Sequence, residues 1–406
     1  MLNSREIQCT IMKESIHNYE RRFKSVLNKL NNDSSISKKN KLLILKFKED
    51  CFANGLSTGR ATKYIYHLIR LNRWLNKNFE DATKEDIKSL VIKIEKCQLV
   101  DYTKMELMTC IKKLYRMLRN TEDYPTEVKW IIPHRKKIEK IKLPEELLTE
   151  DDIIGLINSA NNPRDKAFVS MLYETGCRIG EILFIRNKHI HFDEYGAVVV
   201  VTGKTGARRL RIITSVPYLT EWLNHHPFRE KPDAYIWICN GDKVLSYERI
   251  TGILKYLGKK AGVKKKLNPH NFRHSRATYL ANHLTEAQMK VYFGWVRASD
   301  MAAVYVHLSG RDVDNAILKV HGITNNNDKE ESKLKPKNCP RCEKVNQATN
   351  KFCSLCGMLL DRESMMKIVE MDIERKEADR ILDELINDGE FRAMFLRKAR
   401  ELVKQS

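Results

Sequence analysis

Four short segments in the middle of the chain carry residue types that together could catalyse phosphoryl transfer. Their sequences are ETGCRIGEIL, TGKTGARR, NPHNFRHSRAT and YFGWVRASDMAAVYVHLSG, and they supply Arg178, Lys204, His270, Arg273, Trp295 and Tyr305. Two arginines can bind the non-bridging oxygens of one phosphate through their fork-shaped donors. A lysine can protonate a leaving alkoxide, a histidine can accept a proton, and a tyrosine can attack phosphorus. Since no acidic cluster that would hold Mg²⁺ accompanies the set, we expect this chemistry to need no metal.

The third segment has the local features of a helix that begins at the site. Asn268 is a favourable N-cap, and Pro269 suits the first helical position. His270 and Arg273 are then three residues apart and share one face of the helix. Because the N-terminus of a helix attracts anions, this arrangement favours a phosphate beside them.

The order of these residues resembles the catalytic set of the tyrosine recombinases, the family of lambda integrase and the Xer-like proteins. TGCRIGEIL resembles the first-arginine box of that family, with Arg178 in the arginine place and Glu181 in its usual acidic place. Lys204 matches the hairpin lysine, and PHNFRHSRAT resembles the His-x-x-Arg box. GWVRASDMAAVY resembles the last box, with Trp295 where many members have histidine and with Tyr305 as the tyrosine. The resemblance covers about residues 40–325.

The resemblance implies a site-specific recombinase or integrase that cleaves and rejoins double-stranded DNA. Tyr305 would attack a scissile phosphate, form a 3′-phosphotyrosyl link and release a 5′-hydroxyl. Arg178 and Arg273 would stabilise the transition state, Lys204 would be the general acid, and His270 would be the base or a second phosphate donor. A 5′-hydroxyl of the partner strand would then reverse the step. The resemblance also implies a homo-oligomer, expected to be a tetramer on paired sites, and no nucleotide cofactor.

Two other functions fit parts of the same pattern. A type IB topoisomerase-like nicking and closing enzyme uses a similar set of residues. A zinc-ribbon DNA-binding protein with an inactive recombinase domain is the other alternative. Single residues also have simpler interpretations: Lys204 lies in a basic turn with Arg208 and Arg209, Trp295 could be only a core residue, and His274 is more typical of a structural histidine.

A second chemical motif lies near the end of the chain. The sequence NCPRCEKVNQATNKFCSLCGMLL contains two Cys-x₂-Cys pairs, formed by Cys339, Cys342, Cys353 and Cys356. Four thiolates at this spacing predict a tetrahedral Zn²⁺ site, and the pattern resembles a zinc ribbon. Gly357 follows the second pair and permits the tight turn that directs backbone amides toward sulfur. Because four cysteines leave no open coordination position, we expect the zinc to be structural.

The elements around these motifs predict a mainly α fold with a small antiparallel β-sheet. Apolar residues follow a helical period in the first third of the chain, and the β-branched runs GAVVVVTG and LRIITSV predict a hairpin around Lys204. AYIWIC is a further candidate strand. The predicted segments are a leader helix (1–35), a helical core-binding domain (36–125), an α+β catalytic domain (143–325), a zinc ribbon (338–360) and a helical tail (361–406), with linkers after 125 and after 325.

The charge of the chain predicts a polyanionic partner. Its formal net charge is +21, and residues 255–276 contain eight lysines and arginines without an acid. Such a segment fits contacts with a phosphate backbone. No run of about 18 apolar residues and no apolar signal-peptide core occur, so we expect no membrane span and a cytoplasmic location.

Overall fold

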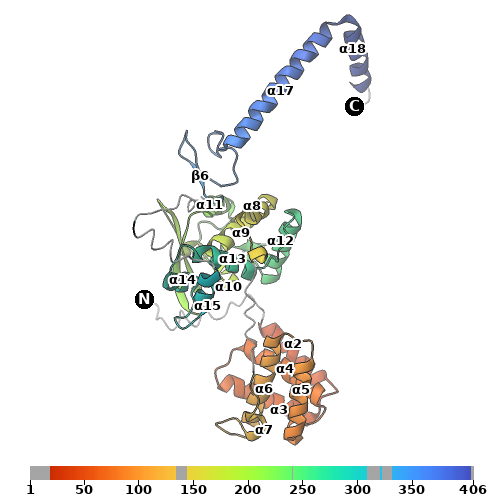
Figure 1. The fold of residues 1–406 in the computed structure, drawn as a ribbon, viewed down its shortest axis with the longest axis vertical. Helices are drawn as coiled ribbons and strands as arrows, with labels where there is room; N and C mark the ends of the chain where they lie inside the picture. The colour runs from red at the N-terminus through yellow and green to blue at the C-terminus, as the bar shows by residue number, and fades with distance from the viewer. Residues whose placement is uncertain (1–18, 134–143, 240, 309–320, 322–331, 404–406) are drawn as a thin grey trace. The chain divides into compact units, whose positions relative to one another are not determined.

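The computed structural model describes residues 19–133, 144–239, 241–308, 321 and 332–403 (Figure 1). The chain divides into two compact units, Met1–Ile141 and Lys142–Ser406. The predicted α-rich fold with small antiparallel sheets is confirmed in these residues. No helix of the described residues is long and apolar enough to cross a membrane.

The first unit is a bundle of helices. Its α-helices are α2 (Tyr19–Asn32), α3 (Lys38–Ala53), α4 (Thr58–Leu75), α5 (Lys84–Lys96), α6 (Asp101–Leu118) and α7 (Thr126–Lys129). Thr83 caps α5, since its side chain accepts from the Asp86 backbone N–H while the Asp86 side chain accepts from the Thr83 backbone N–H. Val26 and Leu30 of α2 are buried in the same core as the following helices. The leader helix therefore packs into the bundle.

The segment after α6 differs from the linker that the sequence predicts. α7 lies within it, and Val128 and Ile131 are buried in the core of the bundle. The Nζ of Lys112 donates to the Ile131 carbonyl at 2.8 Å. The linker prediction is therefore wrong for residues 126–131, because their apolar side chains complete the bundle.

The second unit is built around a buried helix. Its α-helices before the cysteine cluster are α8 (Glu150–Ser159), α9 (Pro163–Thr175), α10 (Ile179–Leu183), α11 (Val216–His225), α12 (Tyr247–Lys260), α13 (Pro269–Ala281), α14 (Glu286–Phe293) and α15 (Met301–Leu308). Most of α9 is buried, including Phe168 and Leu172, and it packs against α8, α11 and α13 (Figure 1). This packing places the end of α9 and the start of α10 beside α13.

The sheet of the second unit contains the predicted hairpin. Strands β1 (Ile190–Asp193), β2 (Gly196–Gly203) and β3 (Gly206–Ile212) pair in the order β1-β2-β3, all antiparallel. Gly203 pairs with Gly206, so Lys204 lies at the tip of the hairpin. The candidate strand AYIWIC is mostly wrong, because only its last two residues form β4 (Ile238–Cys239), paired with β5 (Lys243–Val244).

Two smaller parts follow in the same unit. The cysteine cluster contains β6 (Lys337–Asn338) and β7 (Val345–Asn346), which pair with each other. It contacts α11, where the Tyr218 hydroxyl lies 3.0 Å from Oγ1 of Thr349. The tail forms α17 (Arg362–Asn387) and α18 (Gly389–Val403), two helices separated at Asp388.

Candidate functional site

Arg178 is held in place by the buried carboxylate of Glu181. Arg178 is the N-cap of α10, and its backbone N–H donates to Oε2 of Glu181 at 2.9 Å. Its Nη1 donates to Oε1 at 2.9 Å, and Nη2 of Arg208 on β3 donates to Oε2 at 2.7 Å. The side chain of Arg178 remains 40% exposed, whereas that of Arg208 is only 9% exposed. Arg178 is therefore both fixed and accessible to a ligand.

Glu181 is ionised in this environment. Burial opposes its ionisation, but the hydrogen bond and the charge of Arg208 hold the pKa of Glu181 below its ordinary value. Gly203 and Gly294 lack side chains where the cluster of Glu181, Arg178 and Arg208 needs space. A Cβ on Gly203 would collide with Oε1 of Glu181, and a Cβ on Gly294 would lie 2.8 Å from Nη1 of Arg208.

Arg273 lies deeper than Arg178 and is held by backbone carbonyls. It is 5% exposed on α13, its Nη1 donates to the Gly176 carbonyl at 3.0 Å, and its Nη2 donates to the Phe293 carbonyl at 2.6 Å. Its guanidinium carbon lies 5.0 Å from the ring centroid of Phe293 and 5.4 Å from that of Trp295. Burial and the nearby charge of Arg178 lower the pKa of Arg273 to about 10, so it remains a cation at neutral pH.

The two predicted arginines converge on one backbone segment. Nη1 and Nη2 of Arg178 donate to the Gly294 carbonyl at 3.4 and 3.3 Å, and Arg273 donates to the preceding carbonyl, that of Phe293. Both guanidinium groups therefore lie beside the Phe293–Gly294 backbone.

Tyr305 is buried beside these arginines. It lies on α15, is 4% exposed, and belongs to a small core with Phe293 and Ala277. Its ring stacks on Trp295, with centroids 5.5 Å apart, and its hydroxyl is hydrogen bonded to Nδ1 of His274. Burial raises the pKa of Tyr305 to about 12, and the charge of Arg273 opposes that rise.

His270 and Trp295 also lie at this site. His270 is exposed in the first turn of α13, behind the N-cap that Asn268 forms by accepting from the Asn271 backbone N–H. The His270 ring lies 4.4 Å from that of His274 in an edge-to-face contact. The ring of Trp295 stacks on that of Phe293 and on that of Tyr305.

Lys204 does not contact the other predicted site residues through a hydrogen bond or an ion pair among the described residues. It is exposed at the tip of the β2–β3 hairpin. The neighbouring Thr205 does reach the site, because its Oγ1 donates to the Gly294 carbonyl at 3.2 Å. The hairpin tip therefore lies next to the arginines.

Two residues of the site, Arg208 and His274, are not among the predicted catalytic residues. Arg208 lies on the same face of β3 as the buried Leu210 and Ile212, so strand alternation was a signal that it points inward. His274 follows His270 by one helical turn, so helical spacing placed it on the same face. The sequence indicates for Arg208 only a place in the basic turn around Lys204, and His274 is more typical of a structural histidine.

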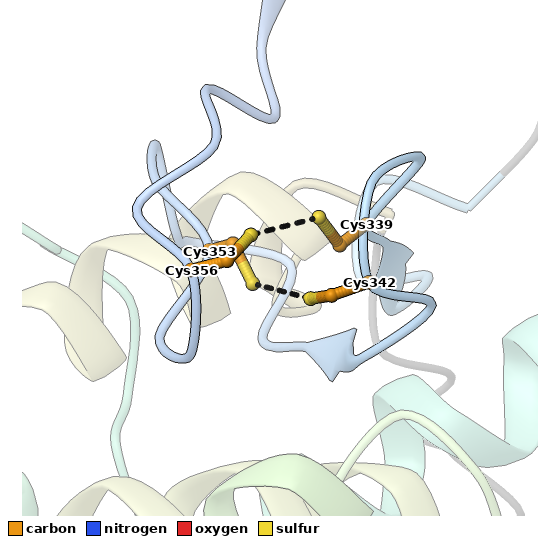
Figure 2. Close-up of side chains that lie close together, drawn as sticks. All are labelled: Cys339, Cys342, Cys353 and Cys356. Carbon is orange, nitrogen blue, oxygen red and sulfur yellow. Dashed lines mark hydrogen bonds between the residues drawn. The ribbon is translucent and has the colours of Figure 1, made fainter.

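The four predicted cysteines of the second motif lie together (Figure 2). Their sulfur atoms are all within 4.8 Å of one another, and the pairs Cys339–Cys356 and Cys342–Cys353 are 3.5 Å apart. Tetrahedral Zn²⁺ with Zn–S bonds of about 2.3 Å places sulfur atoms about 3.8 Å apart. The four thiols therefore fit a metal ion of this geometry.

The backbone around Cys353 stabilises its thiolate form. Backbone N–H groups of Cys356 and Leu355 lower the pKa of Cys353 to about 6, and Nδ2 of Asn346 donates to its sulfur at 3.6 Å. The residue after each cysteine pair has a left-handed backbone: φ is +57° at Glu343 and +72° at Gly357. The two pairs thus form matching turns, one with glutamate and one with glycine at the left-handed position.

The chain is similar to known recombinases and integrases. Residues 146–311 match the sequence model of the phage integrase family. "Tyrosine recombinase XerA" of Pyrococcus furiosus is 33% identical over 198 residues, which cover 47% of this chain and 68% of that protein. "Tyrosine recombinase XerD" of Bifidobacterium longum is 24% identical over 289 residues, 66% of this chain and 92% of that protein.

A solved structure supports the fold. The XerH site-specific recombinase bound to a palindromic difH substrate, in a post-cleavage complex, has a TM-score of 0.54 to this chain. The match is 15% identical in sequence and covers 75% of this chain and 95% of that one. At this identity the likeness extends to the fold alone.

Proposed function

The chain belongs to the tyrosine recombinase family, whose enzymes break and rejoin DNA, and we propose that it is a site-specific recombinase with Tyr305 as its nucleophile. One observation carries this proposal: Arg178 and Arg273 donate to the adjacent carbonyls of Gly294 and Phe293, next to the buried ring of Tyr305. A scissile phosphate bound between these guanidinium groups would lie within reach of the tyrosine. The product of attack would be a 3′-phosphotyrosyl bond.

Each predicted residue has a role in this proposal. Arg178 and Arg273 neutralise the charge that develops on the phosphoryl oxygens. Lys204, exposed at the hairpin tip, protonates the leaving 5′-oxygen. His270, exposed at the N-terminus of α13, binds the phosphate or accepts a proton. Trp295 packs against the ring of Tyr305 and sets its position.

Capture of the covalent intermediate tests the nucleophile. A double-stranded DNA substrate nicked beside the cleavage site loses the attacking 5′-hydroxyl by diffusion, so the protein remains attached. We expect a covalent adduct with the full-length protein and none with Tyr305→Phe, while Tyr279→Phe serves as the matched control. An adduct that persists in Tyr305→Phe would refute the assignment. Relaxation of supercoiled DNA without sequence preference would favour the topoisomerase-like alternative.

We also propose that the four cysteines bind structural Zn²⁺. Cys339, Cys342, Cys353 and Cys356 would hold the ion, which would join the two turns into one small domain without taking part in catalysis. Metal analysis should find one zinc per chain, and a chelator should unfold residues 338–360 while the rate of adduct formation is retained. Reduced thiols are required for this site, in agreement with a cytoplasmic location.

The assembly on DNA is a further part of the proposal. We propose that residues 36–125 form a core-binding domain and residues 143–325 a catalytic domain, which together contact double-stranded DNA. The net charge of +21 supports a polyanionic partner. Exchange of two strands between paired sites requires four active sites, so we expect a tetramer. Sedimentation with and without DNA that contains two target sites measures this state.

A further inference from the structure

The hydroxyl of Tyr305 has a specific partner that the proposed mechanism does not use. It is hydrogen bonded to Nδ1 of His274, a half-buried residue on α13. The ring centroids of the two residues are 5.7 Å apart. His270, in contrast, is exposed and contacts the His274 ring edge-to-face. His274 therefore lies between His270 and the tyrosine along this series of rings.

A buried phenol needs a proton acceptor before it can attack phosphorus. Burial raises the pKa of Tyr305 to about 12, so at neutral pH the hydroxyl is protonated. Arg273 stabilises the phenolate but has no lone pair to accept the proton. A neutral imidazole with its Nδ1 directed at the hydroxyl is the acceptor that general base catalysis requires.

We propose that His274 is the general base that takes the proton from Tyr305, and that His270 contacts the phosphate. This inference rests on the proposed function, because it presupposes that Tyr305 is the nucleophile. In the cleavage step, a bond forms between the Tyr305 oxygen and phosphorus while the bond from phosphorus to the 5′-oxygen breaks. The phenolic proton moves to Nδ1 of His274, and the leaving 5′-oxygen receives a proton from Lys204. In the reverse step His274 returns its proton to the tyrosine.

A purely structural role for His274 makes a different prediction. A residue that only orients Tyr305 needs a hydrogen-bond acceptor but does not need to take up a proton. Asparagine distinguishes the two roles, because its side-chain oxygen lies near the position of Nδ1 and accepts a hydrogen bond without being protonated. His274→Asn thus preserves the contact and removes the base.

The experiment measures the rate of adduct formation by the full-length protein on the nicked DNA duplex at saturating concentration. We expect His274→Asn to slow this rate by about 100-fold or more, the usual effect of a lost general base, with DNA affinity changed less than twofold. Added imidazole should partly restore the rate of His274→Gly. The control is His283→Asn, an exposed histidine just beyond α13 whose ring contacts Tyr279, and it should keep the full rate.

A substrate with sulfur in place of the leaving 5′-oxygen separates the acid from the base. Thiolate leaves without protonation, so this substrate should restore the rate of Lys204→Ala but not that of His274→Asn. A His274→Asn rate equal to the wild-type rate, with the adduct still on Tyr305, would overturn this inference alone. An adduct on another residue would instead overturn the proposed function.

Discussion

Each unit of the molecule contains a buried glutamate surrounded by cations, and the two clusters are built differently. Glu181 is 4% exposed in the second unit, and Glu106 is 2% exposed in the first. Both oxygens of Glu181 accept hydrogen bonds, from Arg178 and Arg208. Among the described residues, Oε2 of Glu106 has no hydrogen-bond partner, although it forms an ion pair with Lys63 and lies 3.8 Å from Nε2 of His67.

The cations of the two clusters also differ in exposure. Arg208 is 9% exposed, so its charge is used inside the protein to fix Glu181 and, through it, Arg178. Arg60 and Lys63 beside Glu106 are 41% and 43% exposed. Their cationic groups lie 5.0 Å from the ring of Tyr64 and 5.2 Å from that of Tyr102, respectively. The Glu181 cluster therefore orients a single arginine, whereas the Glu106 cluster holds two cations at the surface.

The strongest test of this difference is Glu181→Gln. The variant leaves Arg208 buried without a counter-charge, which should lower the free energy of unfolding by about 3 kcal/mol. It also releases Arg178, so we expect adduct formation to slow about 100-fold. Chemical denaturation and the nicked-substrate assay measure the two effects. Glu194→Gln, at an exposed residue, is the control, and an unchanged cleavage rate in Glu181→Gln would show that Arg178 is positioned by other groups.

The Glu181 cluster also makes the stability of the second unit depend on pH, and the direction of this dependence can be derived. Because the pKa of Glu181 is lower in the folded protein than its ordinary value of 4.5, the ionised carboxylate stabilises the fold above that pH. The stabilisation is lost as the pH falls through the folded pKa. Glu181→Gln should therefore remove part of the acid sensitivity of the second unit below about pH 4.5.

A second test enlarges a glycine that contacts the Glu181 cluster. A methyl group at Gly203 would collide with Oε1 of Glu181, so Gly203→Ala must displace the carboxylate. Overpacking of this kind costs about 1–3 kcal/mol, and we expect a loss of cleavage rate between tenfold and 100-fold. Gly252→Ala on α12 is the matched control, because no atom lies within 4 Å of the added methyl group. Equal cleavage rates in the two variants would mean that the carboxylate position does not matter.

Arg208 holds the Glu181 carboxylate, yet the sequence indicates for it only a place in the basic turn around Lys204. The boxes around Arg178, His270, Arg273 and Tyr305 were visible because residue type and order are properties of the sequence itself. The inward direction of Arg208 depends on the register of β2 and β3, which pairs it with the buried Val201. A basic turn and a buried arginine have the same composition, and strand alternation separates them only once the start of β3 is known.

The helices and strands were likewise predictable where the signal is local, and not where it depends on tertiary contacts. Strong local signals, such as the helical period of the first third of the chain and the β-branched runs of the hairpin, predicted the observed helices and strands. Val128 and Ile131 looked like linker residues because the short α7 has too few residues to show a helical period. The contact between Tyr305 and His274 joins two helices, and no spacing within either helix encodes it.

The surface cations of the Glu106 cluster give the next test. We expect the double variant Arg60→Gln and Lys63→Gln to bind DNA about tenfold more weakly at moderate salt. Because two phosphate contacts would be lost, the slope of log affinity against log salt should become shallower by about 2. Lys88→Gln with Lys93→Gln on α5 is the control pair. At saturating DNA the cleavage rate should be unchanged, and a slower cleavage step would remove the contrast with Glu181.

The smallest expected effect comes from His67, the third basic residue at Glu106. Burial lowers the pKa of His67 to about 4, with Glu106 opposing this shift and Lys63, Arg70 and Arg60 adding to it. The folded protein therefore keeps His67 neutral at a pH where the unfolded chain, with a pKa of about 6.5, binds a proton.

The sign of the pH effect follows from this proton balance. Between about pH 6.5 and 4 the unfolded state binds more protons, so the stability of the first unit falls as the pH falls. From pH 7.5 to 5.5 the loss should be about 1 kcal/mol, measured by hydrogen exchange of the α4 amides in the full-length protein. His67→Gln should remove this loss, whereas His225→Gln, at an exposed position on α11, should not. If the pH dependence persisted in His67→Gln, another titrating group of the first unit would cause it, and the neutral His67 beside Glu106 would not be its source.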